Sequence, residues 1–226
     1  MPRNVRRRRG SLPRPTYGAL VTTVVLVPGG LWDDMDAAEF WDQPGVTSAL
    51  RDQGFDVQAV DRLPRAPSWR AESAWLDAAL PRDRAYDVVA GSNGCSAAVR
   101  LAIDYPARVG RIVLCWPATP RRHRVEGPLS LELEAAHGAA AADTLPGGDT
   151  LRGIADDELR NLSVPVAVVP PDPENYFHEQ ATVDALLTLA PNARGLPGST
   201  EPPRPDFPEH LDRFVDILVD EIRNGG

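Results

Sequence analysis

The feature that most constrains this chain is a regular alternation of short apolar segments with amphipathic ones. The first apolar segment, residues 20–27, contains only Leu, Val and Thr and ends at Pro28-Gly29-Gly30. A run with so many β-branched residues and no polar alternation is typical of a strand that is covered on both faces of a parallel sheet. The same pattern predicts strands over 20–27, 55–61, 86–91, 111–117, 164–169 and 193–197, and helices over 46–54, 69–80, 93–106, 181–190 and 210–222.

Strands that alternate with helices along a whole chain form right-handed βαβ units. We therefore expect a three-layer α/β fold with a mainly parallel sheet of about six strands, in one domain over residues 19–226. The pattern loosens over residues 118–160, which are acidic and alanine-rich, with LPGG in the middle. We expect an insertion with two or three short helices there.

The charged residues exclude several classes of function. All 24 basic residues are arginine, so a Schiff-base lysine and the lysine of a P-loop are both missing. Residues 1–15 hold six arginines and no acidic residue, which leaves 18 arginines against 32 acidic residues, a formal charge of −14, in the remaining chain. An acidic body argues against a nucleic-acid partner, and no apolar run is long enough for a membrane helix.

The arginine-rich head and the two cysteines bear on the compartment. RRRRG followed by an apolar run is similar to a secretion signal, but the run is short and leads into PGG instead of a cleavage site. We expect residues 1–18 to be a disordered basic leader of a cytoplasmic protein, either a monomer or a homodimer. Cys95 and Cys115 are then expected to be buried free thiols, although the sequence does not show whether they could meet in a disulfide.

The turn after the third predicted strand reads Ala90-Gly91-Ser92-Asn93-Gly94-Cys95 and has two possible frames. A nucleophile elbow needs small residues two positions before and two positions after the side chain at its tip. With Ser92 at the tip, these positions hold Ala90 and Gly94. With Asn93 at the tip, the second position holds the bulkier Cys95, so the residues favour Ser92.

The block VVAGSNG, followed by RLAIDYPARV and RIVLCWPA, resembles the core of the α/β-hydrolase superfamily. Members of that family place the proline of the Tyr-Pro or His-Pro pair fourteen residues after the nucleophile. Fourteen is the spacing from Ser92 to Pro106 here. The resemblance covers about residues 20–225 and implies the α/β-hydrolase fold without its first two strands, a serine nucleophile at Ser92, a lid over 118–160 and no metal or organic cofactor.

The resemblance also implies an oxyanion hole. One donor is the N–H of the residue after the nucleophile, here Asn93. The other comes from the loop after the first strand, which usually reads His-Gly-x and here reads Pro28-Gly29-Gly30-Leu31-Trp32. The replacement of His by Pro at position 28 does not remove the backbone N–H groups of the residues that follow. Gly30 or Leu31 is therefore expected to supply the second N–H.

A serine hydroxyl needs a general base, and the sequence offers four histidines: His123, His137, His178 and His210. The first two lie in the insertion. The family carries its base in the loop after the last strand, which favours His210, although the usual position, about ten residues before the Phe of the final helix, holds Arg204. His178, after the fifth predicted strand, is the alternative.

The acid of the triad follows the fourth or the fifth strand in the family. The fourth is followed by CWPATP, which has no carboxylate, and the fifth by VVPPDPENYF. The family pattern aligns Glu174 with the acid, and Asp172 is the alternative. The expected triad is therefore Ser92, Glu174 and His210, in the chain order nucleophile, acid, base.

Aromatic side chains are expected beside this site, because Trp32, Trp116, Tyr176 and Phe177 all follow the carboxyl ends of strands. They favour a small apolar or aromatic substrate, although each could equally belong to the core. We expect a serine hydrolase that cleaves an ester, lactone or thioester. A cyclase or acyl transferase that uses the same site, and a non-catalytic binding protein, are the alternatives.

Overall fold

A computed structural model describes residues 22–30, 35–120, 128–138, 145, 147–202 and 204–225 of the 226-residue chain. The predicted leader over residues 1–18 lies outside the described residues, as do Leu31, Trp32 and His123.

The described chain folds around a six-stranded sheet in the order β2-β1-β3-β4-β5-β6, in which every neighbouring pair is parallel. The strands are β1 (Thr23–Val27), β2 (Asp56–Ala59), β3 (Tyr86–Gly91), β4 (Val109–Cys115), β5 (Val166–Val169) and β6 (Ala193–Gly195). The predicted strand number and parallel sheet are confirmed. The alternation of apolar segments was sufficient to predict them, because each strand is followed by a connection long enough for a parallel crossover.

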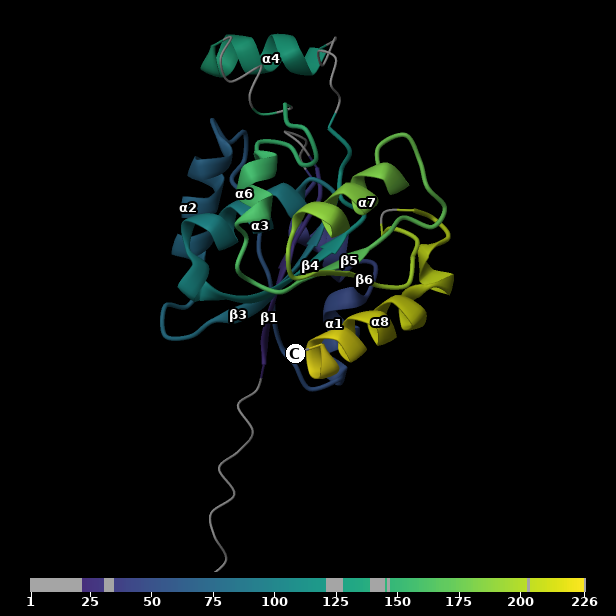
Figure 1. The fold of residues 1–226 in the computed structure, drawn as a ribbon. Coiled ribbons are helices and arrows are strands. Elements are labelled where there is room, and N and C mark those ends of the chain that lie inside the picture. Colours follow the sequence, from purple (N-terminus) through teal and green to yellow (C-terminus); the bar gives the residue numbers. More distant parts are fainter. Residues whose placement is uncertain are drawn as a thin grey trace, which may run out of the picture.

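Helices cover both faces of the sheet (Figure 1). One face carries α2 (Trp69–Ala79), α3 (Gly94–Asp104), α6 (Asp156–Arg160) and α7 (Gln180–Leu189). The other carries η1 (Ala38–Asp42), a short π-helix that the sequence did not predict, with α1 (Val46–Asp52) and α8 (Leu211–Asn224). Two 3-10 turns, η2 (Pro106–Arg108) and η3 (Phe207–Glu209), complete these layers.

The two faces hold two separate hydrophobic cores, because successive side chains of a strand point to opposite faces. Along β1, Val25 and Val27 belong to the core under α2 and α3, whereas Val24 and Leu26 belong to the core under α1 and α8. All four are fully buried. The continuous apolar run of β1 follows from this double burial.

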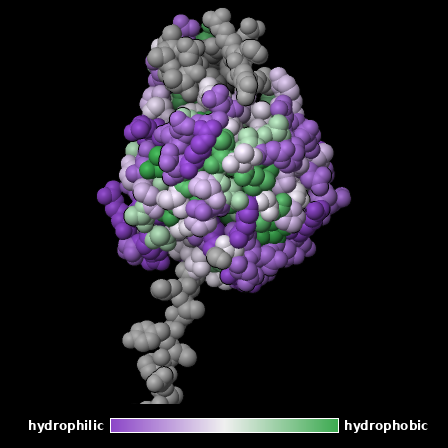
Figure 2. Space-filling view, in the orientation of Figure 1, coloured by the Kyte–Doolittle hydropathy of each residue, from purple (hydrophilic) through white to green (hydrophobic). Residues whose placement is uncertain are grey.

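The insertion contributes α4 (Pro128–His137), which lies beyond the carboxyl ends of the strands (Figure 1). Its action as a lid stays a prediction. Polar residues cover most of the face seen in Figure 2, with apolar residues gathered toward its centre. None of the described helices combines the length and the apolar character that a membrane span needs.

The strand order reverses direction between β1 and β3: the chain moves from β1 outward to β2, and then crosses to β3 on the other side. In open parallel sheets, the loops on either side of such a switch point diverge and leave a crevice at the carboxyl ends of the strands. Gly29 and Gly30 follow β1, and Ser92 follows β3, so the two predicted parts of the site meet at this point.

Candidate active site

Ser92 stands at the tip of a sharp turn between β3 and α3. Its φ of 50° lies in the left-handed region, which a residue with a side chain adopts only where the surrounding structure enforces it. The Ser92 N–H donates to the Cys115 carbonyl of β4 at 2.9 Å. Asn93, in contrast, has an ordinary helical φ of −66° as the N-cap of α3. The structure therefore adopts the frame with Ser92 at the tip.

The turn admits only small neighbours, as the elbow pattern requires. A methyl group on Gly94 would collide with the Pro28 carbonyl oxygen of the loop after β1. On Gly91, a methyl group would lie 2.6 Å from the ring of Phe40, which η1 places against the turn. Close packing from two sides keeps the strained Ser92 conformation in place.

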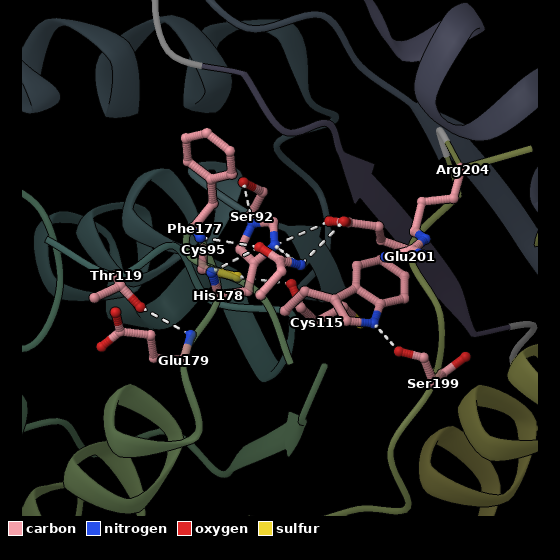
Figure 3. A network of polar contacts seen from close by, with 12 residues as sticks. Ser92, Cys95, Cys115, Thr119, Phe177, His178, Glu179, Ser199, Glu201 and Arg204 are labelled. Carbon is pink, nitrogen blue, oxygen red and sulfur yellow. Dashed lines mark hydrogen bonds and ion pairs between the residues drawn. The ribbon is translucent and has the colours of Figure 1, made fainter. Parts of the chain in front are cut away.

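His178 and Glu201 complete a line of hydrogen-bonding groups behind Ser92 (Figure 3). The His178 Nε2 lies 2.9 Å from the Ser92 Oγ, and the His178 Nδ1 lies 3.0 Å from the Glu201 Oε2. An ionised carboxylate only accepts hydrogen bonds, so a neutral His178 carries its proton on Nδ1. The Nε2 lone pair is then directed at the serine hydroxyl. His178 is only 6% exposed, so water has little access to this line.

This arrangement differs from the expected triad. The structure brings Ser92 to His178, the alternative base, and places Glu201 behind it. His210 is the N-cap of α8, and its N–H donates to the Phe207 carbonyl. Glu174 is exposed, and its Oε2 accepts a hydrogen bond from the Gln180 N–H at the start of α7.

Asp172, the alternative acid, makes backbone contacts that connect two loops. It is exposed, and its backbone joins the loop after β5 to the loop after β6. The Asp172 N–H donates to the Ser199 carbonyl, and the Thr200 hydroxyl donates to the Asp172 carbonyl, both at 3.0 Å. These bonds continue the β5–β6 pairing past the ends of the strands and hold the two loops side by side.

Relative to the resemblance, the histidine and the carboxylate are exchanged between two loops. The loop after β5, expected to carry the acid, carries His178, and the loop after β6, expected to carry the base, carries Glu201. The strands are neighbours in the sheet, so an imidazole from one loop can reach both the serine and a carboxylate from the other. The chain order of the three side chains is serine, histidine, carboxylate.

Asn175 and Thr119 hold the His178 loop in place. The Asn175 Oδ1 accepts hydrogen bonds from the N–H groups of Phe177 at 2.9 Å and His178 at 3.2 Å, and its Nδ2 lies 3.4 Å from the Glu201 Oε1. The Thr119 N–H donates to the Phe177 carbonyl, and its hydroxyl accepts from the Glu179 N–H (Figure 3). The sequence does not predict Glu201, Asn175 or Thr119, because their contacts depend on the pairing of loops that are separate in the chain.

Of the predicted oxyanion donors, the structure describes Asn93 and Gly30. Asn93 is the N-cap of α3, so its N–H belongs to the helix N-terminal groups that have no intrahelical partner. Its side-chain Oδ1 accepts a hydrogen bond from the buried Arg152 at 2.9 Å. Gly29, the residue before Gly30, adjoins the serine so closely that a methyl group there would lie 3.1 Å from the Ser92 Cβ.

The aromatic residues expected around the site divide into two groups. Trp116 is 1% exposed and belongs to the core, where its ring lies 4.9 Å from that of Phe214 and its Nε1 donates to the Ser199 carbonyl. Trp116 was expected to line a substrate pocket, and its burial in the core differs from that expectation. Tyr176 and Phe177 are 66% and 58% exposed and contact each other edge to face beside His178.

Two free thiols lie directly beneath the turn. Cys95 and Cys115 are fully buried, and the Cys95 thiol donates toward the Ala90 and Cys115 carbonyls. Burial raises the pKa of both thiols, so neither forms the reactive thiolate at neutral pH. Across the described parts of the chain, no group of His, Cys, Asp and Glu side chains is arranged to hold a metal ion.

Solved structures with the same fold include several enzymes. An enol-lactonase from Burkholderia xenovorans LB400 matches with a TM-score of 0.63 and 18% identity over 90% of this chain and 92% of that one. A carboxylesterase from Bacillus subtilis matches with a TM-score of 0.59 and 19% identity over 91% and 85%. An α/β-hydrolase enzyme from a sediment metagenome of the Mar Chica lagoon matches with a TM-score of 0.61 and 13% identity over 91% and 92%.

At these identities the likeness concerns the fold. No protein-family model matches the sequence, and no curated protein matches it. The parallel six-stranded sheet, the turn at Ser92 and the extent of these structural matches nevertheless agree: the chain has the α/β-hydrolase fold.

Proposed function

We propose that this protein is a serine hydrolase that cleaves an ester, lactone or thioester through an acyl-enzyme, with Ser92 as nucleophile, His178 as general base and Glu201 as the acid that orients the base. The observation that carries the proposal is the 2.9 Å distance between the Ser92 Oγ and the His178 Nε2, with the Glu201 carboxylate 3.0 Å behind the Nδ1.

The proposed reaction uses these groups in sequence. The Ser92 Oγ attacks the substrate carbonyl carbon while His178 Nε2 takes the hydroxyl proton, and Glu201 stabilises the imidazolium that results. The N–H groups of Asn93 and Gly30 or Leu31 bind the oxyanion. The imidazolium returns the proton to the leaving alcohol or thiol. A water molecule, activated by the same base, then releases the acid product and frees Ser92.

The aromatic pair beside the base supports a substrate with an apolar or aromatic group. Tyr176 and Phe177 follow the same strand as His178 and present exposed rings at the site. Aromatic side chains bind apolar groups by burying apolar surface, and they bind other rings through edge-to-face or offset-stacked contacts. Trp32, which follows the predicted oxyanion residues in the sequence, stays a predicted part of this pocket.

The test compares the two histidines and the two glutamates that compete for the triad. We expect Ser92→Ala to abolish labelling by a fluorophosphonate probe, and His178→Ala to lower turnover of p-nitrophenyl esters at least about a hundredfold. Glu201→Gln, which keeps the side-chain shape but not the charge, should also lower turnover at least about a hundredfold. His210→Ala and Glu174→Gln are the matched controls and should keep turnover within about threefold.

Other outcomes would contradict the proposal in different ways. A folded protein that does not label would favour the non-catalytic binding protein. Labelling without hydrolysis of any ester, together with transfer of the acyl group to an added alcohol or amine, would favour an acyl transferase or cyclase at the same serine. If His210→Ala abolished turnover and His178→Ala did not, the assignment of the base would be wrong.

A further inference from the structure

Arg62, in the loop after β2, binds the back of the predicted oxyanion loop. Its Nη1 donates to the Gly29 carbonyl at 3.0 Å and also to the Gly30 carbonyl. Its Nε and Nη2 pair with the carboxylate of Glu72, which lies on α2 and is only 2% exposed. The guanidinium stacks 5.6 Å from the centre of the Trp69 ring. One side chain thus joins α2 to two consecutive peptide units after β1.

These two peptide units are the ones whose N–H groups are predicted to bind the oxyanion. The Gly29 carbonyl belongs to the same peptide unit as the Gly30 N–H, and the Gly30 carbonyl belongs to the same unit as the N–H of the next residue. In a planar trans peptide, the C=O and the N–H point in opposite directions. Arg62 therefore holds both carbonyls on its own side and turns the Gly30 N–H away from itself.

We propose that Arg62 is a positioning residue that fixes the oxyanion loop in its donor orientation, and that Glu72 fixes Arg62. A glycine pair has more conformational freedom than any other, and Gly30 adopts a φ of 81°. Without an external contact, these peptide units could rotate and turn their carbonyls toward the oxyanion. A cation bound to a carbonyl also polarises the peptide unit, which makes its N–H a better donor. The inference rests on the proposed hydrolase function.

The chain contains a closely matched control, Arg108. It also pairs with a carboxylate of α2, with its Nε 2.9 Å from the Asp77 Oδ1, and donates to a backbone carbonyl, that of Leu80. It also stacks on an aromatic ring, 5.4 Å from the centre of Tyr86. Side-chain exposure is 13% for Arg62 and 14% for Arg108. Arg108, however, lies in η2, just before β4, at the opposite end of the sheet from Ser92.

The experiment compares Arg62→Ala with Arg108→Ala. Both variants lose one anchor of α2, so both should lose stability. Only Arg62→Ala should lower kcat at least about tenfold with KM nearly unchanged, because the oxyanion exists only after attack. Its affinity for a boronic acid, which forms a tetrahedral adduct with the serine, should fall by about the same factor as kcat/KM.

Chemical rescue separates positioning from a structural role. A cavity of about 210 Å³ borders Gly29, Gly30, Arg62 and Glu72, so a small cation has room to enter beside Arg62. Guanidinium at tens of millimolar, well below denaturing concentrations, should restore part of kcat in Arg62→Ala. It should restore none in Arg108→Ala and should not raise kcat of the unmodified protein.

Arg62→Ala leaves the Glu72 carboxylate buried and unpaired, which destabilises the fold. If this variant does not fold, a second pair of variants keeps the test decisive. Arg62→Met with Glu72→Gln, and Arg108→Met with Asp77→Asn, replace each ion pair by neutral groups of similar shape. Equal kcat in the two double variants, or equal boronic acid affinity, would overturn the role of Arg62. An unmodified protein that neither labels nor hydrolyses esters would overturn the proposed function first, and this inference with it.

Discussion

At the scale of single residues, Asn175 makes contacts that its amide is well suited to combine. Its oxygen accepts from two successive N–H groups of the His178 loop, while its nitrogen faces the Glu201 carboxylate. An aspartate could make the first contacts but would repel Glu201, and a leucine could make none. Asn175 therefore holds both the His178 loop and Glu201 in position.

We expect Asn175→Ala to lower kcat about 10- to 100-fold, because small displacements of a catalytic group have effects of this order. Stability should fall only modestly, since one side chain's hydrogen bonds are lost in a partly exposed loop. Ester hydrolysis and thermal unfolding measure the two effects. Asn161→Ala, which removes an exposed amide bonded to the Asp157 carbonyl, is the control. Equal kcat for the two variants would contradict the role of Asn175.

The residues of the site differ in how far the sequence predicts them. Ser92 was predictable, because the elbow is a local structure whose steric needs appear in neighbouring residues. The pairing of His178 with Glu201 was not, because it depends on two loops that are far apart in sequence and adjacent only in the folded sheet. The family order of acid before base pointed to Glu174 and His210 instead.

At the scale of elements, α6 is attached to α3 by one ion pair. Arg100, on α3 and 4% exposed, donates to both carboxylate oxygens of Glu158 at 2.8 and 2.7 Å and to the Gly153 carbonyl. The Arg100 hydrogen bond holds the pKa of Glu158 below its usual range. The insertion ends with α6, so this contact joins its last helix to α3, the helix that follows the Ser92 turn.

This pair predicts a dependence of stability on pH. A carboxyl group with a lowered pKa in the folded state contributes stability that is present above the unfolded value, near 4.5, and is lost as pH falls through the folded value. The free energy of unfolding should therefore fall more steeply below about pH 5 for the unmodified protein than for Glu158→Gln. Urea unfolding at pH 7 and pH 4 measures this.

The exposed Glu209 offers the control for that measurement. Glu209→Gln should keep the steeper loss of the unmodified protein, because its side chain lies on the surface of η3. The same slope for Glu158→Gln as for the unmodified protein would show that the Arg100 pair does not contribute to the acid sensitivity.

At the scale of the whole molecule, one tryptophan joins β4 to α8, to η1 and to the loop after β6. Trp116 follows β4, packs against Phe214 of α8 and lies 6.3 Å from Trp41 of η1. Its Nε1 donates to the Ser199 carbonyl, two residues before Glu201. The sequence indicated the layers of this fold through strand and helix periodicity. The way a side chain connects those layers depends on their packing, so the sequence could not assign Trp116 to the core.

We expect Trp116→Ala to lower the free energy of unfolding by about 3–5 kcal/mol, the usual cost of removing a large aromatic side chain from a core. Trp75→Ala, which removes a tryptophan that is 46% exposed, should cost less than about 1.5 kcal/mol. Urea denaturation measures both. A small loss at Trp116 would contradict its place in the core and restore its predicted role at the substrate surface.

The exchange of histidine and carboxylate between the loops after β5 and β6 affects how similar proteins can be found. A search pattern that requires a serine, then a carboxylate, then a histidine selects Glu174 and His210 in this chain and misses the pairing of His178 with Glu201. A template that stores only the three-dimensional positions of the hydroxyl, imidazole and carboxylate groups, without chain direction, retrieves both arrangements. For engineering, this arrangement means that the histidine and the carboxylate can be placed on either of two neighbouring loops while the serine keeps its position.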